Sequence, residues 1–149
     1  MLLPNYNDFK NIFQIGKNQL VYKRLPADLD TAVSLMIKLT ENKKNSFLLE
    51  SVTGGEIKGR YSVIGMNPDL IWECFGKTSR LKTKFNKKFS KFKQCENSPL
   101  LALRKLISES KIDIPDSLPQ MSAGLFGFLG YDMIRLAENL PNIKPDVLQ

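Results

Sequence analysis

Histidine is absent from the chain of 149 residues, and cysteine occurs only twice, at Cys74 and Cys95. Without histidine, the chain cannot form a serine–histidine triad or a zinc site with histidine ligands. The two cysteines do not form a CxxC pair or any other ligand-like spacing. We therefore expect two reduced thiols, with Cys74 in a core.

Long hydrophobic runs are also missing. No window approaches the roughly 18 to 20 apolar residues that a membrane span needs, and the N-terminus "MLLPNYNDFK" lacks the order of a secretory signal. We expect a cytoplasmic protein that does not bind membranes. A length of 149 residues with 42% hydrophobic content is enough for one domain with a core. The final stretch "LPNIKPDVLQ" offers no capping helix or closing strand, so we expect a part of a longer protein.

Acidic residues are missing from one segment, residues 76–93, which holds eight bases. The chain has 22 bases and 15 acids, so the remainder has 14 bases against 15 acids and a net charge of −1. Bases alternate with apolar residues around Lys82, Lys84 and Phe92, which is typical of two strands that each have one solvent-exposed face. The stretch "NKK" at 86–88 is the expected turn between them. A hairpin with solvated lysines and core-facing phenylalanines competes with a platform for single-stranded nucleic acid. We favour the hairpin, because lysines on an exposed strand block edge-to-edge pairing, and we expect no nucleic-acid partner.

Two helices and four strands are predicted in the first half of the chain. A short helix over 7–13 is capped by Asn7 or Asp8 and closes near Gly16, and a second helix runs from Asp30 to about Asn42. The second helix carries an apolar stripe that we expect to be buried: Val33, Met36, Ile37 and Leu39. Strands are predicted over 19–25, 46–51, 60–65 and 70–75.

The second half begins with a helix capped by Ser98, with Pro99 at its first position. Its predicted apolar face comprises Leu100, Leu103, Leu106 and Ile107. The glycines at 124, 127 and 130 are typical of a strand close to another backbone, and Asp132 is the expected cap of a last helix. These patterns predict an α+β fold, with a largely antiparallel sheet and flanking helices.

The stretch "FLLESVTGGEIKGRYSVIG" contains the most unusual loop. Gly54 and Gly59 have the spacing of a phosphate-binding loop, but Arg60 and Tyr61 replace its Lys and its Ser or Thr. Ser51 has no histidine to activate it as a nucleophile. Two interpretations stay open: Ser51 is a turn serine, or it helps to bind a small zwitterion. In the second, Ser51 and Glu50 bind an ammonium and Arg60 binds a carboxylate.

Three stretches, "LPADLDTAVSLMIKL", "LLESVTGGEIKGRYSVIG" and "AGLFGFLGYDMIRLAENLP", resemble the anthranilate synthase component I family of chorismate-utilising enzymes in order and spacing. Together they cover about Val21 to Pro141. The second matches the "LLES…GRYS" signature, and the third is similar to the GGLxGYxGYD segment. Ala123 and Phe128 depart from that segment.

The resemblance implies that residues 1–149 are the N-terminal region of the large subunit. Such enzymes aminate chorismate with ammonia and release pyruvate to give anthranilate, with Mg²⁺ held near the substrate. A glutamine amidotransferase subunit, component II, supplies the ammonia. The family's chorismate and Mg²⁺ residues belong to the C-terminal part, so the resemblance implies no catalytic residue and no metal ligand in this chain. We expect the chain alone to be inactive.

The same resemblance implies feedback inhibition by tryptophan in this region. The serine of "LLES", Ser51, is implied to line the tryptophan pocket, with Glu50, Arg60 and Tyr61 nearby. Two alternatives remain: aminodeoxychorismate synthase component I of the folate pathway, and a stand-alone regulatory module that binds an amino acid.

Overall fold

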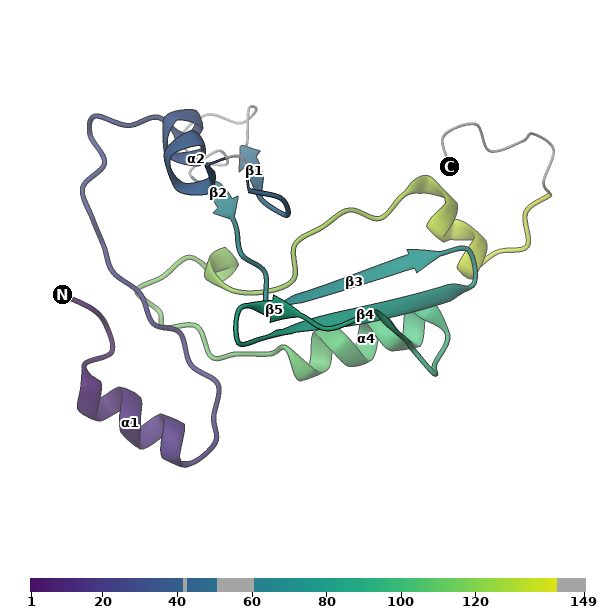
Figure 1. The fold of residues 1–149 in the computed structure, drawn as a ribbon, viewed down its shortest axis with the longest axis horizontal. Coiled ribbons are helices and arrows are strands. Elements are labelled where there is room, and N and C mark those ends of the chain that lie inside the picture. Colours follow the sequence, from purple (N-terminus) through teal and green to yellow (C-terminus); the bar gives the residue numbers. More distant parts are fainter. Residues whose placement is uncertain (42, 51–60, 142–149) are drawn as a thin grey trace. The chain divides into compact units, whose positions relative to one another are not determined.

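The computed structural model describes residues 1–41, 43–50 and 61–141. Two compact units divide the chain: one holds residues 1–69 and 112–123, and the other holds residues 70–111 and the chain from residue 124 onward. Both contain helices, and their extended strands pair antiparallel, which confirms the predicted α+β class (Figure 1).

The first helix, α1, spans Tyr6–Gln14 and starts earlier than predicted. Its N-cap is Asn5, whose side chain accepts hydrogen bonds from the backbone N–H groups of Asn7 and Asp8. The prediction of Asn7 or Asp8 as the cap was therefore wrong, because a cap must precede the N–H groups that it satisfies. The end of the helix was predicted correctly: Gly16 follows it with a positive φ of 70°.

The second helix, α2, spans Ala32–Thr40, and its N-cap is Thr31. Thr31 and Ser34 form a reciprocal capping box, with bonds of 2.9 and 3.1 Å. Asp30, the predicted cap, instead accepts hydrogen bonds from the Ser34 hydroxyl and from Lys38 Nζ. The predicted end at Asn42 lies outside the described residues.

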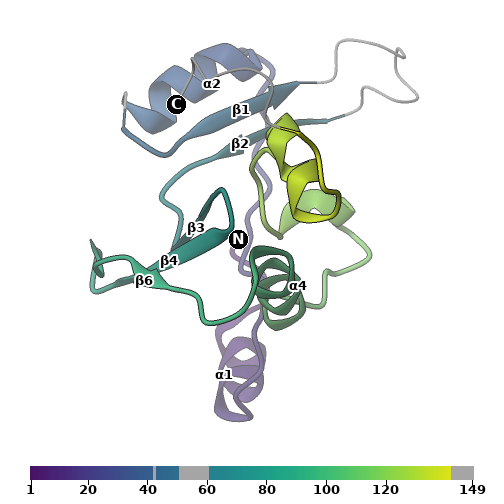
Figure 2. The same cartoon turned by 90° about the vertical axis from the view of Figure 1, so that its right-hand side faces the viewer.

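Strands β1, Phe47–Glu50, and β2, Ser62–Gly65, form an antiparallel hairpin that confirms two predicted strands. Figure 2 shows α2 lying along this hairpin, and the two are in contact. The predicted buried stripe of α2 was wrong for Val33, Ile37 and Leu39, which are exposed, whereas its fourth member, Met36, is half-buried. Ala32 and Leu35, which were not predicted, are half-buried as well.

Residues 19–25 do not form the predicted strand. A single antiparallel bridge joins Tyr22 to Leu3. The Tyr22 hydroxyl lies 3.1 Å from Ser117 Oγ, and Arg24 donates to the Ser117 carbonyl. Backbone hydrogen bonds to Leu3 and side-chain hydrogen bonds to Ser117 hold this stretch, so its alternating pattern does not require a sheet.

In the second unit, β3, Leu70–Phe75, and β4, Thr78–Phe85, form a long hairpin. Gly76 supplies a positive φ of 55° in its two-residue turn. The other edge of β4 pairs with β5, Lys88–Phe89, and then with β6, Lys93–Gln94. Asn86 and Lys87 both have positive φ between β4 and β5, which is the backbone of a type I′ turn. The turn is therefore one residue shorter than the predicted 86–88.

A β-bulge separates β5 from β6. Lys84 faces Phe89, whereas Leu81 faces Lys93, so three steps along β4 match four along the partner. Ser90 occupies the bulge: its N–H donates to the Thr83 carbonyl, and its hydroxyl accepts from the Thr83 N–H at 3.2 Å.

Helix α4, Pro99–Glu109, lies beside β4 (Figure 1). Ser98 is its N-cap residue and Pro99 its first residue, as predicted, although the Ser98 side chain makes no capping hydrogen bond. Pro99, Ala102 and Leu106 are buried, whereas Ile107, predicted for the same face, is half-exposed at 49%. Ser79 of β4 is buried as well.

The segment from 124 to 141 contains no strand among the described residues. Residues 125–130 have no regular secondary structure, and a 3-10 helix, Tyr131–Leu136, follows, where a helix capped by Asp132 was predicted. Gly130 is its N-cap, and Asp132 accepts a hydrogen bond from Arg135. A second 3-10 helix, Gln120–Ser122, belongs to the first unit. Within the described part of the chain, no helix is long and apolar enough to cross a membrane.

Candidate functional site

The predicted tryptophan-binding residues flank one loop. Glu50 ends β1, and Tyr61 directly precedes β2. Ser51 and Arg60, the other two predicted residues, lie outside the described residues. The structure therefore brings Glu50 and Tyr61 to the same end of the hairpin, and it leaves the positions of Ser51 and Arg60 as predictions.

Glu50 faces Ser62 across the hairpin. The two Cα atoms are register partners, and the Ser62 hydroxyl lies 3.5 Å from Glu50 Oε1. Both residues are exposed, as is Tyr61. An exposed carboxylate at this place can accept hydrogen bonds from an ammonium group, and the nearby hydroxyl limits its rotation.

At the opposite end of the hairpin, Phe47 and Gly65 set the register. They are Cα partners, and the Phe47 ring lies directly over Gly65. A Cβ atom at position 65 would sit 2.1 Å from the ring, so the ring occupies the space that only glycine leaves open. A slip by one residue would turn every side chain to the other face. This contact therefore helps to determine which residues flank the loop.

A second candidate surface lies on the β3–β4–β5–β6 sheet; we call it the basic aromatic face. It consists of Arg80, Lys82 and Lys84 of β4 with the rings of Phe75, Phe89 and Phe92. Lys82 Nζ lies 4.3 Å from the centroid of the Phe92 ring and 5.1 Å from that of Phe89. Arg80 Cζ lies 4.3 Å from the Phe92 centroid, and Lys84 Nζ lies 5.6 Å from that of Phe89.

This surface corrects the prediction that the phenylalanines of the basic hairpin face the core. Phe89 and Phe92 lie on the same sheet face as Lys82, and Phe85 is 78% exposed. The bulge is the reason: in a regular strand, residues three apart point to opposite faces, and one extra residue restores them to the same face. The cations cover the rings and so leave them less open for stacking on nucleic-acid bases.

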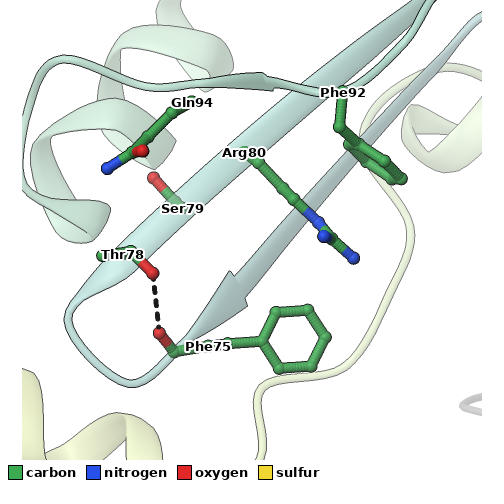
Figure 3. Close-up of a pocket in the computed structure, with 6 residues that line it drawn as sticks. All are labelled: Phe75, Thr78, Ser79, Arg80, Phe92 and Gln94. Atoms are coloured by element: carbon green, nitrogen blue, oxygen red, sulfur yellow. Dashed lines mark hydrogen bonds between the residues drawn. The ribbon is translucent and has the colours of Figure 1, made fainter.

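Arg80 stands at one end of the basic aromatic face, beside an open hollow of about 590 Å³ (Figure 3). The lining residues are Phe75, Thr78, Ser79, Arg80, Phe92 and Gln94. The guanidinium makes contacts of 2.7 and 2.9 Å with one carboxylate oxygen of Glu73. An anionic ligand in the hollow would compete with Glu73, so the hollow is a weak candidate for binding.

The Glu73–Arg80 pair was missed by sequence reasoning, although the sequence contains a signal for it. The two residues lie at equal distances from the turn at Gly76 and Lys77, and equal distances from a two-residue turn make cross-strand partners. The predicted pattern concentrated on the lysines and did not assign Arg80 to the same hairpin as β3.

The described residues contain no group of three His, Cys, Asp or Glu side chains that could hold a metal ion. Cys74 and Cys95 are free thiols, as predicted. Cys74 is only half-buried rather than in a core, and partial burial raises the pKa of its thiol. A raised thiol pKa disfavours the nucleophilic thiolate at neutral pH. Buried polar atoms without a partner in the described part of the chain are Gln19 Oε1, Trp72 Nε1 and Ser79 Oγ.

Comparison of the sequence with known proteins assigns the chain to a family. The chain is 55% identical over 146 residues, or 98% of its length, to "Anthranilate synthase component 1" of Cereibacter sphaeroides. The chain belongs to the anthranilate synthase component 1 family. Component 1 proteins of Acetivibrio thermocellus and of a Synechocystis species are 38% and 35% identical over 80% and 97% of the chain.

The chain spans only part of the component 1 proteins that it matches: 29%, 23% and 28% of the lengths of these three relatives. No protein-family model matches the chain, and no solved structure matches it. The family assignment therefore rests on the sequence relatives, and the structure adds the positions of the residues around the loop.

Proposed function

We propose that residues 1–149 form the N-terminal, tryptophan-sensing region of an anthranilate synthase component I. The observation that carries this proposal is the 55% identity to the Cereibacter relative over 98% of the chain. In the complete protein, chorismate and ammonia are converted to anthranilate and pyruvate in tryptophan biosynthesis. A glutamine amidotransferase subunit, component II, supplies the ammonia in the cytoplasm.

Chorismate binding and Mg²⁺ binding are assigned to polypeptide beyond these 149 residues. The described residues contain no group of three His, Cys, Asp or Glu side chains that could hold a metal ion. Glu50, the charged residue in the described part of the β1–β2 hairpin, is exposed, whereas a catalytic site needs groups in a water-poor environment. We therefore propose no catalytic residue in this chain, and we expect it to be inactive alone.

The loop between β1 and β2 is the proposed regulatory site for free tryptophan. The Glu50 carboxylate and the Ser51 hydroxyl accept hydrogen bonds from the ammonium group of the ligand, and Arg60 binds its carboxylate. Tyr61, at the other end of the loop, offers an aromatic surface that is 45% exposed. The hairpin supports this proposal, because antiparallel pairing brings residues 50 and 61 to the same end.

The test is the variant Ser51→Ala in the complete component I with its amidotransferase subunit. A hydrogen bond to a charged group is worth roughly 1.5 to 3 kcal/mol, so tryptophan affinity should fall about ten- to more than a hundredfold. Anthranilate production without tryptophan should be unchanged. The measurement is an inhibition curve for each protein.

Ser46→Ala is the matched control, because Ser46 precedes β1 at the far end of the hairpin and donates its hydroxyl to the Lys43 carbonyl. Its half-inhibitory tryptophan concentration should equal that of the unmodified protein. An unchanged value in Ser51→Ala as well would show that Ser51 is a turn serine with no role in inhibition.

The product of the complete protein tests the reaction itself. Fluorescent anthranilate from chorismate supports the proposal, and the names of the relatives favour this product. Aminodeoxychorismate in its place would assign the chain to the folate pathway. Tryptophan binding by a protein that does not consume chorismate would assign it to the stand-alone regulatory modules.

A further inference from the structure

Cations and rings alternate in a row along the basic aromatic face. Arg80 Cζ lies 5.3 Å from the centroid of the Phe75 ring and 4.3 Å from that of Phe92, and Figure 3 shows the side chain reaching between the two rings. Lys82 Nζ lies 4.3 Å from the Phe92 centroid and 5.1 Å from that of Phe89. These distances are within the range of a cation–π attraction, so each of the two cations is held between two rings.

The two lysines of this face carry charge that no carboxylate in the described part of the chain neutralises. Lys84 Nζ ends the row, 5.6 Å from the centroid of the Phe89 ring. Glu73 neutralises Arg80, but no ion pair among the described residues includes Lys82 or Lys84. The two lysines lie two residues apart on β4, so they share a face, and like charges on neighbouring positions repel. An anionic partner would remove this repulsion.

The rings restrict the lysine side chains before any partner binds. A lysine side chain loses rotamer entropy when it is held in one geometry, and this loss is one reason why exposed ion pairs contribute little to stability. A cation–π contact restricts the side chain in advance. The ammonium group still keeps N–H donors on the side away from the ring, where a carboxylate oxygen can accept them. Cations ordered in this way are therefore suited to binding carboxylates.

A peptide that carries carboxylates fits this face better than a nucleic acid does. Single-stranded nucleic acid binds where its bases can stack on open rings, whereas cations lie over the rings of Phe89 and Phe92. Residues two apart in a strand are separated by roughly 6.8 Å, and an extended peptide presents its alternate side chains at the same interval. Alternate carboxylates of an extended peptide can therefore meet both lysines.

We propose that the end of the basic aromatic face formed by Lys82 and Lys84 is a docking site for an extended acidic segment of a partner protein. Alternate carboxylates of that segment bind the two ammonium groups, while Arg80 stays paired with Glu73. The charge of residues 76–93, eight bases and no acid, attracts such a segment to this part of the chain. The docking site shares no residue with the proposed tryptophan site, so the two proposals can fail independently.

Binding of a short peptide of alternating glutamate and threonine to the complete component I tests the docking site. The double variant Lys82→Gln, Lys84→Gln should weaken this binding roughly three- to thirtyfold at low salt, because it removes two exposed ion pairs. The matched control Arg104→Gln, Lys105→Gln removes the same charge from exposed positions of α4 and should leave the affinity unchanged. Equal weakening by both double variants, or no binding by the unmodified protein, would overturn the proposal.

Phe92→Leu tests the role of the rings, because it leaves the charge of the face unchanged. It should weaken peptide binding several-fold, since Lys82 then loses one of the two rings that hold it, and Phe92→Tyr should restore the affinity. Hydrogen exchange of the β4 amides shows whether the hairpin stays folded. An unchanged affinity in a folded Phe92→Leu protein would overturn the proposed ordering of the lysines by the rings.

An oligothymidylate with the same number of negative charges as the peptide separates the two classes of partner. The unmodified protein should bind the peptide more tightly, because bases gain no stacking on rings that cations cover. Tighter binding of the oligothymidylate would make the face a nucleic-acid site and would refute the acidic protein segment. None of these measurements uses activity, so a complete protein that makes no anthranilate would refute the proposed function alone.

Discussion

At the scale of single residues, the contact between Phe47 and Gly65 shows how one pair specifies a register. The ring lies where a Cβ atom at position 65 would be, 2.1 Å from the nearest ring atom. Cross-strand pairs of an aromatic residue and glycine bury the bare glycine backbone and strengthen the sheet locally. The hairpin that supports the proposed tryptophan site therefore depends on a residue with no side chain.

Gly65→Ala should destabilise the β1–β2 hairpin by about 1–3 kcal/mol, because the Phe47 ring must move away. The measurement is the free energy of local opening, from hydrogen exchange of the hairpin amides. Gly127→Ala in the 149-residue chain is the matched control, since its Cβ meets open space. In a Phe47→Ala background, Gly65→Ala should cost at least about 0.5 kcal/mol less. An equal cost in both backgrounds would contradict the clash.

Asp30 provides a prediction on pH. Hydrogen bonds from Lys38 and Ser34 hold the pKa of the Asp30 carboxyl below its ordinary value. A carboxyl with a lowered folded pKa stabilises the fold above its unfolded pKa, and this contribution is lost as the pH falls through the folded pKa. The start of α2 should therefore open more readily in acid, below the ordinary range for aspartate.

Lys38→Met is the variant that tests this linkage, because the hydrogen bond from Lys38 Nζ to Asp30 Oδ1 is the main cause of the lowered pKa. The NMR titration midpoint of Asp30 should rise in the variant. The acid-induced opening of α2 should then begin at a higher pH. A midpoint that does not change would show that the exposed pair does not persist in water.

At the scale of elements, two asparagines near the start of α1 have different roles: Asn5 caps the helix and Asn7 lies inside it. Asn5→Ala removes the side chain that accepts hydrogen bonds from two N–H groups, so the stability of α1 should fall by about 1 kcal/mol. Asn7→Ala should cost much less, because Asn7 lies inside the helix and alanine favours helix. Hydrogen exchange of the α1 amides measures both. A larger effect for Asn7 would place the cap where the sequence pattern alone predicted it.

The basic hairpin gives a second lesson about elements. Alternation correctly predicted strands, but the single extra residue at Ser90 changed which side chains share a face. A bulge leaves composition and local periodicity almost unaltered, and the pairing register alone reveals it. The prediction placed the lysines on a solvent-exposed face and the phenylalanines on a buried face. In the structure, Lys82 and the rings of Phe89 and Phe92 lie on the same face and make cation–π contacts.

At the scale of the whole molecule, the described residues bury little. None of their side chains is fully buried, and the buried hydrophobic residues are Ala102 and Leu106. Leu29 is 99% exposed and Tyr131 88%. Burial of apolar surface is the main stabilising contribution to folding, so each unit has a small contribution from its own core.

We therefore expect the 149-residue chain to self-associate and to bind a hydrophobic dye such as ANS strongly. It should also melt without a sharp cooperative transition, and it should not consume chorismate above a blank without protein. Sedimentation velocity, dye fluorescence and calorimetry measure the first three properties. The complete component I is the control and should bind much less dye per mole. A monodisperse monomer with a sharp melt would contradict this expectation.

The sequence by itself determined the α+β class, strands β1 to β4 and the existence of three helices, because hydrophobic period, cap residues and turn glycines are local signals. The family relationship is also a property of the sequence, and the "LLES…GRYS" stretch already indicated it. Predictions failed where local patterns had more than one solution. The cap of α1, Asn5, lies before the predicted residues Asn7 and Asp8, and the cap of α2, Thr31, lies one position after the predicted residue Asp30.

Only the tertiary structure decided which apolar residues lie inside. Val33, Ile37 and Leu39 form a helical stripe in the sequence, yet α2 turns a different face to the hairpin, since packing depends on the partner surface. The register between β4 and its partners, β5 and β6, likewise decided that Phe89 and Phe92 lie beside the lysines. Long-range pairing sets these choices, and a local sequence pattern contains no information on the partner.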